Sequence, residues 1–252
     1  MAFKKQNLLY GIHPVSEALK SGRTIDKAMV KQGNNSPQVN ELIAALRKAN
    51  VTVQFVPPEK LNRITSKNHQ GLVAFLSEID YTDLSQLVPF LYEQGKIPFL
   101  LFLDGITDVR NFGGIARTAE CAGVDGIIIP STGSVSVTAD ALKTSAGALN
   151  KIPVCREKNI SRSLIYLKES GIQLVGTTEK ASDYFYNADY TIPTALILGA
   201  EDTGLSPQVL KQADKLVKIP LLGSIQSLNV GIAASLIMYE VVRQRNKEFL
   251  TR

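Results

Sequence analysis

The sequence is poor in the residues that most often build metal sites, disulfide frameworks and catalytic triads. Its 252 residues include 2 cysteines, 2 histidines and no tryptophan. Cys121 and Cys155 each lie among small or apolar neighbours, which predicts buried thiols rather than a disulfide framework. With only His13 and His69 as imidazole ligands, a zinc site of the usual type is excluded and no metal is expected. Neither histidine adjoins a serine or cysteine nucleophile motif, so triad chemistry has no support.

Long apolar runs and phosphate-binding glycine motifs are also missing. No stretch approaches the ~20 apolar residues of a membrane helix, and the N-terminus has no apolar signal-peptide core. The sequence therefore predicts a soluble, cytoplasmic protein. Neither G-x-G-x-x-G nor G-x-x-x-x-G-K-[ST] occurs, which disfavours a nicotinamide-dependent oxidoreductase and a P-loop NTPase.

The surplus of positive over negative charge lies in the first third of the chain. The net charge is +5, and residues 1–80 contain 11 Lys and Arg against 6 Asp and Glu, whereas residues 81–252 contain 17 of each kind. A basic segment beside a neutral one predicts contact with a polyanion such as RNA. The alternative is that these lysines only solvate a small domain.

The first part of the chain reads as a small α/β domain over residues 1–77. A turn at His13-Pro14 leads into a short helix, and residues 37–50 have helical apolar spacing. Strands are predicted at residues 26–31, 51–56 and 72–76. Residues 78–97 read as a linker with one short helix.

The remainder, residues 98–252, alternates apolar runs with helical segments. The runs cover residues 99–104, 126–130, 173–178, 194–199 and 215–220. Near-continuous Val, Ile and Leu separated by helices is typical of a parallel sheet covered on both faces. Ligands of such sheets bind at the carboxyl ends of the strands.

Three blocks follow such strand ends: DGITDVRNFGGIAR (104–117), LILGAEDTGLS (196–206) and VKIPLLGSIQSLNVGIAAS (217–235). Each starts apolar and breaks into glycines and small polar residues. Their order predicts that successive strands deliver residues to one shared pocket.

The first block suggests a helix that offers an arginine to a ligand. Asn111 suits the N-cap, and Gly113 shares a helix face with Arg117, leaving room for a substrate backbone beside the guanidinium. Such an arrangement fits a phosphate or a sugar hydroxyl. A capped helix with a solvated arginine explains the same pattern.

The second and third blocks differ in character. Glu201 and Asp202 would repel a pyrophosphate and suit a cationic or hydroxyl-bearing ligand, although a tight loop with solvated acids is the alternative. Ser206 and Pro207 then start a helix. In the third block, Ser227 or Asn229 can cap a helix over residues 230–244.

That last helix is apolar almost all round, which predicts burial on every side. A partner subunit explains this better than a free surface, so a homodimer is expected. Ala234 and Ile237 are placed on its seam.

At these blocks the sequence resembles the SpoU (TrmH-like) branch of the SPOUT methyltransferases, which 2′-O-methylate ribose in RNA. LLYGIHPVSEAL and SKNHQGLVA resemble that family's N-terminal substrate-binding domain, which is similar to ribosomal protein L30e. The three blocks resemble its motifs 1, 2 and 3. The chain is most similar to the bacterial enzymes that methylate a guanosine of 23S rRNA.

The resemblance implies a parallel sheet with a C-terminal trefoil knot, S-adenosylmethionine as the methyl donor, RNA as substrate and a homodimer formed through the knotted domain. It implies cofactor contacts from Gly199, Ile219 and Leu228, with Thr177, Leu198, Ala200, Leu221 and Ser227 as neighbours. It matches Arg117 to the family's catalytic arginine, supported by Asn111, Glu201, Ser227 and Asn229.

Several alternatives stay open. tRNA is a possible substrate in place of rRNA, and a catalytically idle RNA-binding module would keep the same fold. An oxidoreductase with an atypical loop is disfavoured by the missing glycine motif. A guanidinium stays protonated in proteins and is a poor base, so Arg117 is expected to grip phosphate and ribose and to stabilise the developing oxyanion. Whether it also takes the proton, and whether accessory proteins are needed, stays open.

Overall fold

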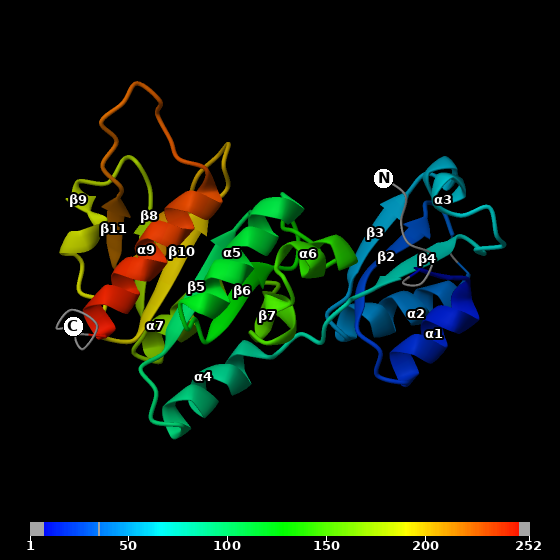
Figure 1. The fold of residues 1–252 in the computed structure, drawn as a ribbon. Helices are drawn as coiled ribbons and strands as arrows, with labels where there is room; N and C mark the ends of the chain where they lie inside the picture. The colour runs from blue at the N-terminus through cyan, green and yellow to red at the C-terminus, as the bar shows by residue number, and fades with distance from the viewer. Residues whose placement is uncertain (1–7, 35, 247–252) are drawn as a thin grey trace. The chain divides into compact units, whose positions relative to one another are not determined.

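The computed structural model describes residues 8–34 and 36–246, and the chain folds into two compact units (Figure 1). The first unit is Met1–Asp80 and the second is Tyr81–Arg252. Each has its own sheet and its own core, as the change of pattern along the sequence predicts. None of the described helices is long and apolar enough to cross a membrane.

The first unit is a four-stranded mixed sheet with helices on both faces. The sheet order is β1 (Leu8–Tyr10), β4 (Leu72–Leu76), β2 (Ile25–Lys31) and β3 (Thr52–Val56). Strand β4 runs antiparallel to β1 and β2, and β2 runs parallel to β3. Helices α1 (Ile12–Lys20) and α2 (Pro37–Lys48) cover one face, and α3 (Pro58–Ile64) packs on the other.

The start of this unit differs from the prediction. His13 and Pro14 lie inside the first turn of α1, and a short strand, β1, precedes them. Gly11, with φ of 90°, makes the change of direction between strand and helix. A proline is tolerated in a first helical turn because the amides there have no partner within the helix.

The second unit is built on a seven-stranded sheet in which every pair of neighbours is parallel. In sheet order the strands are β7 (Val154–Glu157), β6 (Gly126–Pro130), β5 (Phe99–Asp104), β10 (Thr194–Gly199), β8 (Gln173–Thr177), β11 (Lys215–Lys218) and β9 (Asp183–Tyr184). The five predicted strands are confirmed. The two that the pattern missed, β7 and β9, are short edge strands. The predicted trefoil knot stays a prediction.

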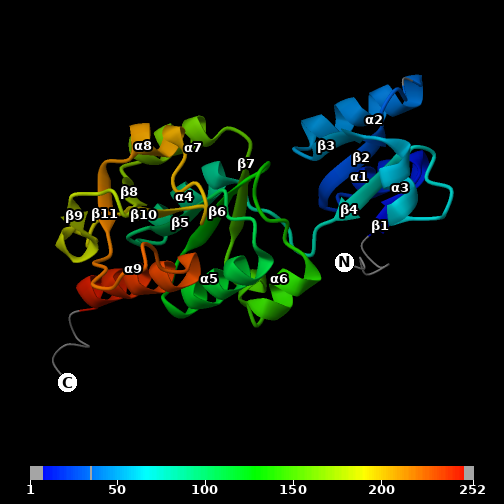
Figure 2. The same cartoon turned by 90° about the horizontal axis from the view of Figure 1, so that it is seen from above.

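Helices cover both faces of this sheet, as Figure 2 shows from above. Helices α4 (Leu84–Glu93), α7 (Ile160–Glu169) and α8 (Pro207–Gln212) pack on one face. Helices α5 (Val109–Cys121), α6 (Ala139–Thr144) and α9 (Val230–Arg245) lie on the other, with α5 between its two neighbours. The predicted two-sided cover is therefore confirmed.

Most of the segment predicted as a linker, from Tyr81 onward, belongs to the second unit. Helix α4 presents Leu84, Leu87 and Leu91, spaced three or four residues apart, to the sheet side chains Leu100 and Phe102. That spacing forms one apolar helix face. Its burial makes residues 84–93 part of the core rather than a free connection.

The two cysteines differ from each other. Cys155 is fully buried, and burial, with smaller contributions from the charges of Glu157 and Asp83, raises its pKa to about 12. Cys121 is exposed at the end of α5, so its predicted burial is wrong. The apolar neighbours of Cys121 in sequence occupy the other side of the helix.

Candidate active site

Residues from all three blocks meet in one hydrogen-bonded network at the carboxyl end of the second sheet. The amide of Asn111 donates to Glu201 Oε1 at 2.5 Å. The amide of Asn229 donates to Asn111 Oδ1 at 3.0 Å and to Glu201 Oε1 at 3.3 Å. The polar ends of three side chains are thus held together, although Asn111 is 90 residues from Glu201 and 118 from Asn229 along the chain.

Two helix starts position this network. Asp108 caps α5 by accepting from the backbone amides of Arg110 and Asn111, each at 2.8 Å. Asn229 caps α9 by accepting from the amides of Gly231 and Ile232 through Oδ1. The predicted cap at Asn229 is confirmed, whereas the cap of α5 is Asp108 and not Asn111. Asn111 therefore has its side chain free for the site.

The loop that carries Glu201 is fixed by its backbone. Ala200 and Gly204 form a two-way antiparallel bridge, with hydrogen bonds of 3.1 and 2.8 Å. A Cβ on Gly199 would lie 2.2 Å from the carbonyl carbon of Gly204, so only glycine fits there. The buried carboxylate of Asp104 accepts from the Ser206 amide at 2.7 Å and ties the end of the loop to β5.

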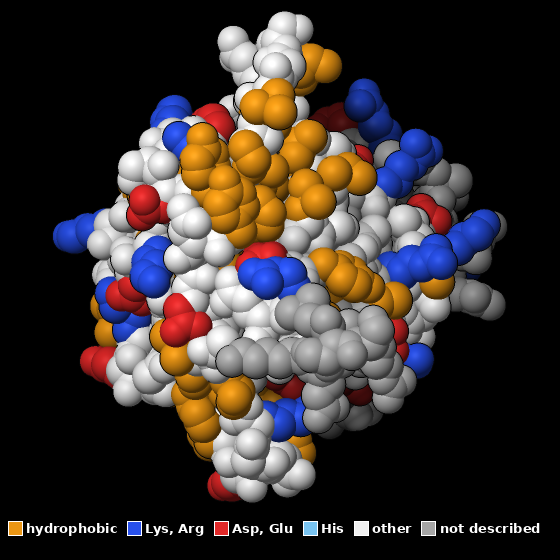
Figure 3. Space-filling model, turned by 60° about the vertical axis from the view of Figure 1, so that its left-hand side comes forward, with side chains coloured by type: hydrophobic (Ala, Val, Ile, Leu, Met, Phe, Trp, Pro, Cys, Tyr) orange, Lys and Arg blue, Asp and Glu red, His pale blue; other side chains and the backbone are white. Residues whose placement is uncertain are grey.

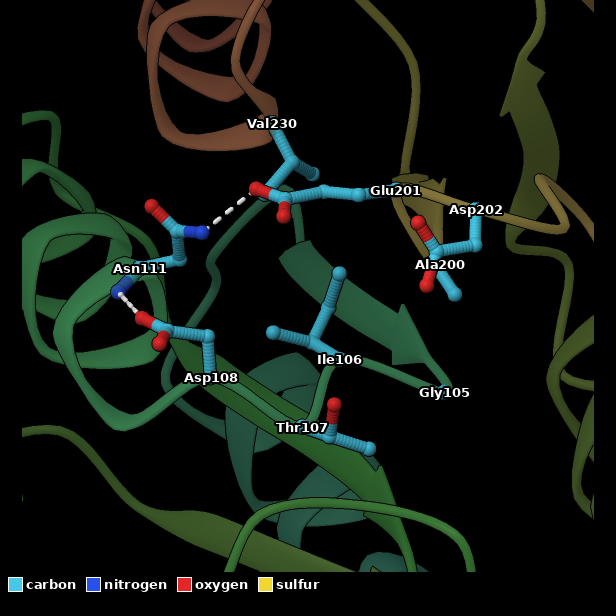
Figure 4. Close-up of a pocket in the computed structure, with 9 residues that line it drawn as sticks. All are labelled: Gly105, Ile106, Thr107, Asp108, Asn111, Ala200, Glu201, Asp202 and Val230. Atoms are coloured by element: carbon cyan, nitrogen blue, oxygen red, sulfur yellow. Dashed lines mark hydrogen bonds between the residues drawn. The ribbon is translucent and has the colours of Figure 1, made fainter.

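A hollow lies against this network, and Figure 4 shows the carboxylate of Glu201 and the amide of Asn111 at its rim. It is lined by Gly105, Ile106, Thr107, Asp108, Asn111, Ala200, Glu201, Asp202 and Val230. The lining is contributed by the segments after β5 and β10, by Asn111 in the first turn of α5 and by Val230, the first residue of α9. This is the edge at which parallel sheets bind ligands.

Thr177 lies at the end of the neighbouring strand. It is in register with Leu198 of β10 on one side and with Val217 of β11 on the other. Its hydroxyl is buried and has no hydrogen-bond partner among the described residues. A buried hydroxyl without a partner is costly in the free protein and marks a place where a ligand can supply the missing hydrogen bond.

The third block spans an open loop. Figure 1 shows residues 219–229 as the wide orange segment between β11 and α9. Leu222 is 100% exposed and Ile225 is 78% exposed, and Leu221 and Leu228 are both partly exposed. Apolar side chains gathered in this way are typical of a surface that binds a partner or ligand.

Comparison with known proteins agrees with this arrangement. A model of the SpoU rRNA methylase family matches residues 98–239, more than half of the chain. A second model, for the substrate-binding domain of RNA 2′-O ribose methyltransferases, matches residues 8–82. The chain belongs to the SpoU (TrmH-like) family.

Individual relatives extend the match to nearly the whole chain. YacO of Bacillus subtilis, which is assigned to the TrmH family of tRNA/rRNA methyltransferases, is 38% identical over 243 residues, covering 96% of this chain and 98% of YacO. The crystal structure of the SpoU methyltransferase AviRb from Streptomyces viridochromogenes, in complex with the cofactor AdoMet, aligns with a TM-score of 0.60 and 28% identity. That alignment covers 95% of this chain and 90% of AviRb.

A further solved relative matches about two thirds of the chain. The crystal structure of the TrmH/SpoU tRNA modifying enzyme of A. aeolicus aligns with a TM-score of 0.56 and 30% identity over 66% of this chain and 86% of that protein. The chain is therefore an RNA 2′-O-ribose methyltransferase of the SpoU family, with a substrate-binding domain in its first unit.

Within this SpoU enzyme, Arg117 and Ser227 stand apart from the network. Both are exposed, and neither makes a hydrogen bond or ion pair with another residue that the structure describes. Arg117 lies on α5 six residues after Asn111, and α5 packs along α9, where Ser235 donates to Thr118 at 3.3 Å. Its guanidinium is thus available to a substrate.

The predicted role of Gly113 is wrong. A Cβ at this position would lie 2.6 Å from Cβ of Thr144 in α6. Gly113 therefore allows α5 and α6 to pack closely and does not open a path for a substrate backbone. The sequence pattern of a glycine four residues before an arginine does not show which side of the helix is covered.

Sequence reasoning also missed two acids that shape the site, Asp104 and Asp108. Asp104 was seen only as the end of a strand, and Asp108 was passed over in favour of Asn111 as the cap. The signal was present in both cases, because an Asp just before a helix or at a strand end commonly accepts backbone amides. Among the described residues, no cluster of three or more His, Cys, Asp or Glu could hold a metal ion.

Proposed function

We propose that this enzyme transfers the methyl group of S-adenosylmethionine to the 2′-hydroxyl of a ribose in 23S rRNA, on a guanosine. The network of Asn111, Glu201 and Asn229 carries the proposal, because it joins residues from all three motifs of a methyltransferase family beside a hollow. The solved relative AviRb binds AdoMet, and the residues present here fit the same molecule.

The fit of the cofactor rests on three features. Thr177 offers a buried hydroxyl without a partner. Gly199 and Ala200, which have no side chain or only a methyl group, leave the backbone at the end of β10 accessible to a ligand next to the buried Leu198. The segment with Ile219, Leu221, Ser227 and Leu228 adds apolar groups and a hydroxyl that have no other described function. When bound, the sulfonium supplies an electrophilic methyl group for in-line attack by a ribose oxygen.

The residues of the chain then have distinct functions. Arg117 binds the phosphate and ribose of the target nucleotide and stabilises the oxygen as negative charge develops on it. A guanidinium stays protonated in proteins and is a poor proton acceptor. Asn111 and Asn229 hold the Glu201 carboxylate at the rim of the hollow, where it orients the hydroxyl. Most of the rate gain comes from this positioning.

The target is proposed as rRNA on the strength of family resemblance, since relatives of this chain are associated with both kinds of RNA. YacO carries the combined description tRNA/rRNA, and the A. aeolicus protein is named as a tRNA modifying enzyme. A catalytically idle RNA-binding module is disfavoured, because such a module has no need to keep three motif residues in one network.

We further propose that the enzyme works as a homodimer through α9. Ile232, Leu236 and Tyr239 are 55%, 44% and 50% exposed and lie on one side of the helix. Figure 3 shows hydrophobic side chains gathered over the end of the second unit that holds β9, β11 and α9. The seam predicted at Ala234 and Ile237 is corrected by the structure, because both are fully buried within their own chain.

The decisive experiment is methyl transfer to defined RNAs. The purified protein is incubated with labelled S-adenosylmethionine and with unmodified transcripts of 23S rRNA domains or tRNA, and 2′-O-methyl positions are then mapped. We expect one guanosine of 23S rRNA to be methylated. Methylation of tRNA alone would overturn the rRNA assignment, and no transfer to either RNA, nor to ribosomal particles from a deletion strain, would overturn the function.

A further inference from the structure

The two faces of the sheet in the first unit are covered unequally. Helices α1 and α2, nine and twelve residues long, cover one face. The other face carries only α3, which has seven residues. A helix of that size is about 10 Å long, whereas a seven-residue strand such as β2 is about 23 Å long. Part of the second face therefore has no helix over it.

Basic side chains gather on this second face. Lys27 and Lys31 project from β2 on the same side as Met29, which packs in the apolar cluster beneath α3. Lys60 and Arg63 belong to α3, and Lys67 follows it. We call these five residues the basic face.

The basic face accounts for all of the unit's described net charge. Its five cations are accompanied by one acid, Glu59, whereas the rest of the described unit has four basic and five acidic side chains. None of the five cations has an ion-pair partner among the described residues, in contrast to Lys20 on α1, which is 3.9 Å from Glu17. The positive charge is therefore directed to one side and left unneutralised.

Two of these cations are held over aromatic rings. Lys27 Nζ lies 4.8 Å from the ring centroid of Phe75, and Lys67 Nζ lies 5.2 Å from that of Tyr10. Phe75 and Tyr10 are on neighbouring strands, β4 and β1, and both project toward this face. A cation placed over a ring has fewer rotamers to lose when it meets a phosphate.

We infer that the basic face is the surface on which the first unit binds the RNA backbone. This rests on the proposed function and adds the side of the domain that the RNA contacts. Charge complementarity selects the ligand, because a row of unpaired cations attracts the phosphates of a nucleic acid and releases their counterions. The opposite face, with α1 and α2, carries three basic and two acidic side chains on its helices and is not part of this contact.

The test compares two pairs of lysines in the full-length protein. The variant Lys27→Gln/Lys31→Gln removes two charges from the basic face. The control Lys20→Gln/Lys48→Gln removes two from α1 and α2, so net charge changes equally. Affinity for a labelled transcript of a 23S rRNA domain, and for a tRNA transcript, is measured at salt concentrations from about 50 to about 200 mM, where phosphate contacts change affinity strongly.

We expect the basic-face variant to bind RNA about tenfold more weakly and to lose about 1 to 2 from the slope of log affinity against log salt. The control should stay within about threefold of wild type, and Lys27→Arg/Lys31→Arg should restore binding. Equal weakening by both pairs, or unchanged binding in the basic-face variant, would overturn the inference.

Two further readouts keep the result interpretable. Unchanged binding of S-adenosylmethionine by every variant shows that the second unit is intact. An unchanged circular dichroism spectrum shows that the secondary structure of the whole protein, including the first unit, is kept. If the wild type shows the expected difference between lysine pairs but transfers no methyl group, the proposed function fails and the basic face stands. If it methylates RNA and the difference is absent, the basic face fails and the function stands.

Discussion

The two ends of the seven-stranded sheet are built for different purposes, and α9 joins them. At the carboxyl end, the first residues of α9 meet Asn111 and Glu201 through side-chain amides beside a hollow. At the amino end, Arg245 donates to the backbone carbonyls of Tyr190, Ile97, Pro98 and Ile192 at 2.7 to 3.2 Å. The start of α9 thus contributes to the candidate active site, and its last turn, through Arg245, anchors the helix to the backbone at the other end of the sheet.

The anchor uses backbone acceptors and the site uses side chains. Arg245 also lies 5.3 Å from the ring of Phe99, and burial lowers its pKa, with the charge of Asp125 acting in the opposite direction. A guanidinium among carbonyls that cannot move fixes the helix. Side chains at the other end can be rearranged by a ligand, so substitutions at the two ends should affect different measurements.

The largest effect is expected from Arg117→Ala. Removing a cation that stabilises developing charge costs about 10²- to 10³-fold in rate, and the exposed Arg117 makes no hydrogen bond or ion pair with a described residue. Single-turnover methylation should fall by at least 100-fold, while S-adenosylmethionine affinity and melting temperature stay unchanged. Retention of more than about a tenth of the wild-type rate, equivalent to under ~1.4 kcal/mol, would contradict the assignment.

A smaller loss of activity is expected from Glu201→Gln. The amide keeps the shape and can still accept from Asn111 and Asn229, but the negative charge is lost, so we expect a rate about 10- to 100-fold lower. Asp202→Asn is the control, because Asp202 makes no hydrogen bond to a described residue and should lose at most about threefold. Equal losses of rate in the two variants would show that the activity does not depend on the hydrogen-bonded network of Glu201.

At the opposite end, Arg245→Met should lower stability and spare the chemistry. Four carbonyls lose their donor, and two of them belong to the buried residues Pro98 and Tyr190. An unmatched buried acceptor costs about 1–3 kcal/mol, so we expect about 3 kcal/mol less free energy of unfolding in urea. Arg245→Lys should lie between this variant and wild type. A fall in the single-turnover rate of folded protein, with stability unchanged, would show that the division between the two ends is wrong.

The surface of α9 between these ends tests the dimer. Leu236→Glu places a charge on the exposed side, and we expect a folded protein of monomeric mass, about 27 kDa, by light scattering. Ile237→Glu, one residue further, places the charge in the chain's own core and should unfold the protein instead. A monomeric wild type at micromolar concentration would refute the dimer.

The sequence predicted the second sheet well because its central strands β5, β6, β8 and β10 have five or six residues and are mostly apolar. The prediction failed where the role of a residue depends on which distant segment packs against it. Gly113 packs against Thr144, and α4 packs against the sheet, yet neither partner is adjacent in sequence. The apolar α9 illustrates the same difficulty, since the pattern cannot divide its residues between the core and an exposed side.

The site was predictable in its members but not in their connections. Asn111, Glu201 and Asn229 stand out as polar residues after strand ends, and the structure joins them. Capping by Asp108 and the link from Asp104 to Ser206 could not be ranked against equally good local alternatives. Those choices depend on distances between distant segments.

Asn229 connects two requirements that are usually met by different residues. Its side-chain oxygen caps α9 by accepting from the Gly231 amide, while its side-chain nitrogen donates to Asn111 and Glu201. Aspartate would serve the helix equally well, since it is as good a cap, but it has no hydrogen to donate and would bring a second negative charge beside Glu201. The helix alone would accept several residues at position 229. The requirement for a side chain that both accepts and donates comes from the active site, so the reaction determines which residue is kept there.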